Sequence, residues 1–121
     1  MKKVLWFSRH NLSDAQIDDL QQLYGLDLDI TQVDRTIGTT REITEEIAAA
    51  DILAIVAPLP LQEQFLKVAG NRPVLIPRNH RVPKEDGGFD FIHAGWSQLQ
   101  KIEVVVKVLT EHPAPEGSFR K

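Results

Sequence analysis

Short apolar runs alternate with amphipathic, helix-like segments along most of this chain, and that alternation limits the possible folds more than any other feature of the sequence. Apolar runs of strand length occupy residues 4–7, 52–57 and 73–77, and residues 26–33 alternate apolar and polar side chains as a half-exposed edge strand does. The segments between them repeat apolar side chains every three or four residues, which is typical of helices that bury one face. Strands joined through helices pair in parallel by right-handed crossovers, so this order predicts an α/β fold.

The first helix has boundaries that local signals define. Ser13 and Gln16 have the spacing of a capping box, in which each side chain bonds to the backbone N–H of the other residue. Leu12 and Ile17 flank that box as a hydrophobic staple. Gly25 follows the last apolar position and predicts the end of the helix, because glycine adopts the positive φ of a C-terminal cap most easily.

Two further helices are expected between the later strands. Thr39 or Thr40 can cap the second helix. The third strand stops at the Pro-Leu-Pro turn of residues 58–60, and Pro60 is well placed to open the third helix because N–H groups of a first turn lack helical partners. Gly70 is expected to close that helix.

The C-terminal part of the chain predicts a different arrangement. Residues 78–88 are interpreted as a polar loop, and residues 89–96 and 102–109 as two strands that pair antiparallel. The expected fold class is therefore α/β, a Rossmann-like, doubly wound, mostly parallel sheet with a C-terminal antiparallel β-hairpin. We expect one domain over residues 1–111 and a flexible tail over residues 112–121.

Composition narrows the class of protein. The chain has 121 residues, 42% of them hydrophobic, which is enough for one core but leaves little room for a second domain. The net charge of -3 argues against duplex nucleic acid as a partner, because such binders are normally basic. The absence of cysteine excludes disulfides and a cysteine nucleophile, and it fits a cytoplasmic location. The apolar run at residues 4–7 is too short for a signal segment or a membrane span, so no membrane partner is expected.

Polar side chains follow each of the four predicted parallel strands. The carboxyl ends of parallel strands meet at one edge of the sheet, and ligands of such sheets bind there. This edge is expected to gather four arginines and two histidines on an acidic chain, beside helix N-termini that add partial positive charge. The sequence therefore predicts a phosphate or carboxylate ligand. The candidate residues are Ser8, Arg9, His10, Asn11, Arg35, Thr36, Pro58, Leu59, Arg78, Asn79, His80 and Arg81.

Structural roles compete with this interpretation. Loops are polar by default, so arginine and histidine in them are often only solvated. Thr39 and Thr40 are more typical of helix caps than of ligand contacts. His93 falls within a strand pattern and is interpreted as a packed or edge histidine, and Trp6 and Trp96 as core residues.

Several common motifs are missing from the sequence. Without G-x-G-x-x-G or a Walker loop, dinucleotide and nucleoside-triphosphate sites of the usual types are not expected. No acidic pair follows the first strand, which argues against a magnesium-dependent receiver domain. No histidine or carboxylate cluster has metal-ligand spacing, so neither a metal nor a cofactor is predicted.

The Ser-Arg-His triplet of residues 8–10, the capped helix after it and the Pro-Leu-Pro turn of residues 58–60 together resemble one group of proteins. They are similar to the small Rossmann-like CRISPR-associated ring nucleases and their relatives on phages and mobile elements, over roughly residues 3–82. The resemblance implies a homodimer that binds a cyclic oligoadenylate, above all cyclic tetra-adenylate, on its twofold axis. It also implies metal-independent cleavage that switches off antiviral CRISPR signalling.

The same resemblance implies catalytic roles for the triplet. Arg9 would bind the scissile phosphate, because its planar fork matches phosphate oxygens. His10 would act as the general acid, since histidine exchanges protons near neutral pH. Ser8 would bind phosphate or orient the attacking hydroxyl. Topology alone adds six residues that would hold the other phosphates and the adenines, namely Asn11, Arg35, Arg78, Asn79, His80 and Arg81. The segment of residues 78–81 has no firm counterpart in the family.

Three other functions stay open at this point. The protein could bind the cyclic nucleotide without cleaving it, as a sponge. Arg9 and His10, followed by Asn11, also fit a phosphohistidine-type phosphatase, although the chain is short for that class. Finally, the basic edge could grip an acidic protein partner on a flat surface rather than a ligand in a concave site.

Overall fold

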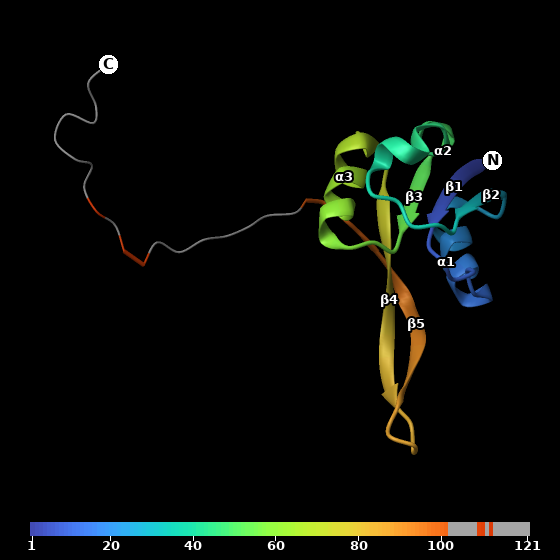
Figure 1. The fold of residues 1–121 in the computed structure, drawn as a ribbon. Helices are drawn as coiled ribbons and strands as arrows, with labels where there is room; N and C mark the ends of the chain where they lie inside the picture. The colour runs from blue at the N-terminus through green and yellow to red at the C-terminus, as the bar shows by residue number, and fades with distance from the viewer. Residues whose placement is uncertain (102–108, 111, 113–121) are drawn as a thin grey trace.

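The computed structural model describes residues 1–101, 109, 110 and 112, and it has the α/β architecture predicted from the sequence (Figure 1). None of the helices in this described part is long and apolar enough to cross a membrane. The elements in chain order are β1 (Lys2–Phe7), α1 (Asp14–Tyr24), β2 (Leu28–Val33), the 3₁₀ helix η1 (Thr40–Ile43), α2 (Thr44–Ala49), β3 (Ile52–Ile55), α3 (Leu59–Ala69), β4 (Val74–Pro83) and β5 (Phe89–Gln98).

The five strands form one mixed sheet in the order β2-β1-β3-β4-β5. Strands β2, β1, β3 and β4 run parallel, and only β5 pairs antiparallel, with β4. The chain leaves β1 toward β2 and then returns to place β3 on the other side of β1. The direction of winding therefore reverses between β1 and β3, and a ligand crevice is expected outside the carboxyl ends of these two strands.

Helices cover both faces of the sheet, because alternate side chains of a strand point to opposite faces. Leu5 and Phe7 of β1 pack in one buried cluster with α3, where the ring of Phe65 is fully buried 5.3 Å from that of Phe7. On the other face, Trp6 packs with the fully buried Leu20 of α1.

Local helix signals are confirmed where the sequence was explicit. The Ser13 hydroxyl accepts a hydrogen bond from the Gln16 backbone N–H at 3.2 Å, and Gln16 Oε1 accepts one from the Ser13 N–H at 2.9 Å. Helix α1 ends before Gly25, as expected. The second predicted helix begins after Thr39, but its first turn is the 3₁₀ helix η1.

The prediction for residues 78–88 was wrong over its first half. β4 continues through residues 78–83, and the chain reverses only at residues 84–88 before entering β5. The antiparallel partner of β5 is thus β4, whereas the predicted partner at residues 102–109 lies almost entirely outside the described residues. The expected tail falls almost wholly outside them too.

The outer part of this hairpin, residues 78–94, is called the arm here, and it extends well beyond the rest of the sheet (Figure 1). The polar residues 78–81, which open the arm, have a physical reason. Pairing between β3 and β4 ends at Leu75, so beyond that point the arm has no third strand beside β4. Pro77 fits here because the lost N–H donor has no neighbour on the β3 side.

A β-bulge at the base of the arm sets the direction of two important side chains. The pairing shifts register between Arg78 and Asn79, so that Ala94 is the extra residue of β5. Gly95 takes a φ of 133°, a conformation that favours glycine. Because of the extra residue, His93 and Trp96 point to the same face of the sheet, with ring centroids 6.1 Å apart.

Candidate functional site

Two neighbouring hollows lie where the switch in winding predicts a crevice, at the carboxyl ends of β1 and β3. The larger has a volume of about 460 Å³ and the smaller about 300 Å³. Both are bordered by Ser8 and His10, which follow β1, and by Val56, which follows β3. The loop of residues 8–10 therefore forms the boundary between the hollows.

Hydrogen bonds from three directions hold the 8–10 loop. Trp6 Nε1 donates to the His10 carbonyl oxygen at 2.7 Å, and Gln32 Nε2 donates to the carbonyl oxygens of Ser8 and His10 at 3.0 and 3.1 Å. The hydroxyl oxygen of the buried Ser8 accepts from the His10 N–H at 3.1 Å. Its backbone is thus fixed, while the side chains of Arg9 and His10 remain exposed.

The smaller hollow is the basic one. Arg9 donates through Nη2 to the hydroxyl oxygen of Thr36, and Arg35 donates through Nη2 to the carbonyl oxygen of Glu42 at 3.1 Å. Both arginines thus bond to uncharged oxygens, and neither takes part in an ion pair within the described residues. Pro58, at the start of α3, completes one wall. Two guanidinium groups without a directly bonded carboxylate favour an anionic ligand.

Glu42 shapes the segment that carries Arg35. Its carboxylate accepts hydrogen bonds from the N–H groups of Gly38 and Thr39, at 2.6 and 3.0 Å. These two bonds, of which the one from Thr39 has the larger effect, hold the pKa of Glu42 below its ordinary value. The charge of Arg35 adds a smaller effect in the same direction. The two bonds are stronger to the ionised carboxylate, so protonation of Glu42 weakens the turn beside the smaller hollow.

Glu42→Gln is expected to flatten the acid side of the stability profile. A carboxyl group whose pKa is lowered by folding stabilises the folded state above its unfolded pKa, and that contribution disappears as the pH falls through the folded pKa. The urea midpoint of the wild type should therefore fall more steeply than that of the variant between about pH 5 and pH 3. Parallel profiles for the two proteins would contradict the role given to Glu42.

The larger hollow has a different chemistry. Its charged or chargeable groups are two histidines, His10 and His93. Its other polar side chains are amides and hydroxyls, and one exposed aromatic ring also lines it. Of the described residues that line either hollow, none is an aspartate or a glutamate. The larger hollow is lined by Trp6, Ser8, His10, Asn11, Ser13, Gln16, Val56, Ala57, Gln62, Ile76, Pro77, Asn79, Phe91 and His93.

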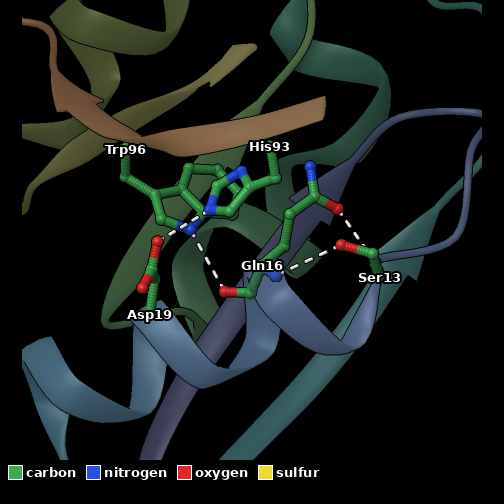
Figure 2. Close-up of polar contacts among 5 residues, drawn as sticks. All are labelled: Ser13, Gln16, Asp19, His93 and Trp96. Carbon is green, nitrogen blue, oxygen red and sulfur yellow. Dashed lines mark hydrogen bonds and ion pairs between the residues drawn. The ribbon is translucent and has the colours of Figure 1, made fainter. Parts of the chain in front are cut away.

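His93 is a packed strand residue, as interpreted from the sequence, but its place in the lining of the larger hollow was not predicted (Figure 2). Its side chain is only 9% exposed, and its Nε2 lies 2.8 Å from Asp19 Oδ2 of α1. Its other ring nitrogen, Nδ1, is buried without a hydrogen-bond partner. Nearby, Trp96 Nε1 donates to the carbonyl oxygen of Gln16 at 3.1 Å. Together these two contacts anchor the base of the arm to α1 and fix the wall that the arm contributes to the larger hollow.

Eight of the twelve sequence-predicted residues line at least one hollow, and they come from the ends of β1, β2 and β3 and from β4. The other four do not. Leu59 is 63% exposed in the first turn of α3, while three residues of the arm lie within β4 rather than in a loop at its end. The eight are Ser8, Arg9, His10, Asn11, Arg35, Thr36, Pro58 and Asn79; the four are Leu59, Arg78, His80 and Arg81.

A hollow elsewhere on the molecule gives a useful contrast. It lies beside β1, β2 and α2 with a volume of about 290 Å³. Its lining includes Asp29, Glu45 and Glu46 against the single cation of Lys3. This surface repels an anion, so the basic character of the smaller hollow at the strand ends is a local property of an acidic chain.

Comparison of the chain with models of protein families, with curated proteins and with solved structures finds no significant match in any of the three. In the described part of the chain, no three histidine, aspartate or glutamate side chains gather closely enough to hold a metal ion.

Proposed function

We propose that this protein is a Rossmann-like ring nuclease that binds a cyclic oligoadenylate across the two hollows and cleaves it. One observation carries the proposal. The rigid 8–10 loop borders both hollows and presents Arg9 and His10 where the described lining holds no carboxylate. A ligand with repeated phosphates and neutral bases fits a basic hollow beside a neutral one.

The proposed chemistry uses groups of the chain and of the substrate. The ribose 2′-oxygen attacks the adjacent phosphorus, so that the O2′–P bond forms and the P–O5′ bond breaks. The 2′-hydroxyl proton leaves to solvent, and His10, in its protonated form, gives a proton to the departing O5′. Arg9 stabilises the charge that develops on the phosphorane oxygens. The products are a 2′,3′-cyclic phosphate end and a free 5′-hydroxyl.

Symmetry supports a homodimer as the acting form. A ring of identical nucleotides has rotational symmetry, and two copies related by a twofold axis would offer it two 8–10 loops. Each loop would face an equivalent phosphate. In this proposal the protein lowers the concentration of a cyclic signal and so ends an antiviral CRISPR response.

The proposal is tested by incubating the purified protein with cyclic tri-, tetra- and hexa-adenylate in EDTA and separating the products by chromatography. We expect conversion of cyclic tetra-adenylate to linear products with 2′,3′-cyclic phosphate ends. His10→Ala should still bind the ring but cleave it at least about 100-fold more slowly, as expected for loss of a general acid.

Two results would contradict parts of the proposal. Tight binding of a ring without turnover would reject the nuclease activity and leave a sponge. If the protein neither binds nor cleaves any ring, the proposed family assignment is rejected as a whole.

A further inference from the structure

The two hollows carry different kinds of side chain and so suit different parts of a ligand. The smaller hollow carries the guanidinium groups of Arg9 and Arg35. The larger one carries four amide side chains, those of Asn11, Gln16, Gln62 and Asn79. Amides pair with groups that both donate and accept hydrogen bonds, whereas arginines pair with anions. A ligand that fits both hollows therefore has a charged part and a neutral, hydrogen-bonding part.

An exposed aromatic ring stands at the rim of the larger hollow. Phe91, on the arm, lines this hollow although its side chain is 65% exposed. Asn79 and His93 form the cross-strand pair two positions along from Phe91, on the same face of the arm, and both of them also line the hollow. The Arg81 guanidinium lies 4.9 Å from the ring centroid of Phe89 and 5.9 Å from that of Phe91. These cation–π contacts restrict the orientation of the ring and leave much of its surface open.

The neutral part of the ligand is best matched by a purine base. Bases stack on aromatic side chains in proteins that bind single-stranded nucleotides. Asparagine and glutamine pair with the N6 amino group and N7 of adenine through the two atoms of their amide. Gln62 uses its Nε2 to donate to the Ala57 carbonyl oxygen at 2.8 Å, which orients its Oε1 as an acceptor.

We infer that the larger hollow is a base subsite in which an adenine ring stacks on Phe91, with its edge toward the amides and its phosphate in the smaller hollow. The inference rests on the proposed function, because it names where the adenine of that ligand binds. It makes the arm part of the ligand site, and it makes Phe91 the residue that favours a nucleotide over a bare phosphate.

The test is calorimetric binding of adenosine 5′-monophosphate and, separately, of inorganic phosphate to the full chain. Phe91→Ala is compared with Phe91→Tyr, which keeps a stacking ring, and with Phe89→Ala. Phe89 is the matched control because it lies on the same arm and contacts the same arginine but does not line the hollow. Thermal unfolding of each variant checks that the fold is retained.

We expect Phe91→Ala to weaken binding of the nucleotide by about 10-fold, the effect of losing one base stack. Binding of phosphate should be unchanged, and Phe91→Tyr and Phe89→Ala should bind the nucleotide like the wild type. Equal losses in Phe91→Ala and Phe89→Ala would overturn the inference. So would an equal loss for phosphate and nucleotide, or a nucleotide that binds no better than phosphate.

The ring experiment separates this inference from the function it rests on. Cleavage of cyclic tetra-adenylate together with nucleotide binding that ignores Phe91 would overturn the base subsite alone. Nucleotide binding that depends on Phe91, with no binding of any ring, would support the subsite and overturn the cyclic ligand.

Discussion

Arg9→Ala is expected to lower the rate of ring cleavage by about 100- to 1,000-fold, the usual cost of removing one preorganised donor to a developing negative charge. Arg9 is held beside the smaller hollow by its hydrogen bond to Thr36 rather than by a carboxylate. In the proposed reaction its charge would therefore be available to the scissile phosphate. The rate is measured by chromatography of the ring and its linear products under single-turnover conditions, so that product release does not mask the chemical step.

Two further variants show whether the effect belongs to the guanidinium at this position. Arg9→Lys keeps the charge but loses the planar fork, and it should recover only part of the rate. Arg41→Ala removes an exposed arginine of η1 that lines neither hollow, and it should cleave like the wild type. Equal rates for Arg9→Ala and Arg41→Ala would contradict the role proposed for Arg9.

Phe65→Ala is expected to lower the free energy of unfolding by about 3–5 kcal/mol, the range for a buried phenylalanine whose truncation leaves a cavity. The Phe65 side chain is fully buried between α3 and the sheet and contacts the ring of Phe7. A domain of this size has only about 5–15 kcal/mol of stability, so the loss is a large fraction of the total. Urea unfolding followed by far-ultraviolet circular dichroism measures it.

Val68→Ala is the control for Phe65→Ala, because Val68 lies on the same helix with 44% of its side chain exposed. Its cost should stay within about 0.5 kcal/mol, as for most surface substitutions. If Phe65→Ala is too unstable to purify, Phe65→Leu retains part of the packing and should show a smaller loss. A cost for Phe65→Ala as small as that for Val68→Ala would contradict the central place of Phe65 in the core.

The sequence predicted those parts of the fold that local interactions determine. The capping box of Ser13 and Gln16 set the start of α1, and Gly25 set its end, since both signals act within one helical turn. The parallel order of β1, β2, β3 and β4 followed from the helices that connect them. That order alone also brought the ends of β1 and β2 together with Pro58, as the lining of the smaller hollow shows.

The arm could not be predicted in the same way. Residues 78–83 are all exposed, so they lack the alternation of apolar and polar side chains by which strands are usually identified. Their pairing with β5 depends on backbone hydrogen bonds, which composition does not report. As a result, Arg78, His80 and Arg81 were expected at a strand end and lie along a strand instead.

The contact between His93 and Asp19 was beyond sequence reasoning for a related reason. These residues are 74 positions apart, and they meet only because the bulge at Ala94 turns His93 toward α1. Neither a motif nor a periodicity signals a one-residue shift of register. The amides and the aromatic ring of the larger hollow were missed with it, except for Asn11 and Asn79.

Trp6 lines the larger hollow and Trp96, the other tryptophan of the chain, packs against Trp6, so the protein has a built-in optical reporter. The indole nitrogen of Trp6 donates a hydrogen bond to the His10 carbonyl oxygen. The Trp96 ring packs edge-on against the Trp6 ring, with 5.7 Å between the ring centroids. Indole emission responds to changes in neighbouring polarity and charge. The molecule has no other indole to dilute the signal. Ligand binding at the strand ends can therefore be followed in real time by the fluorescence of the unlabelled protein.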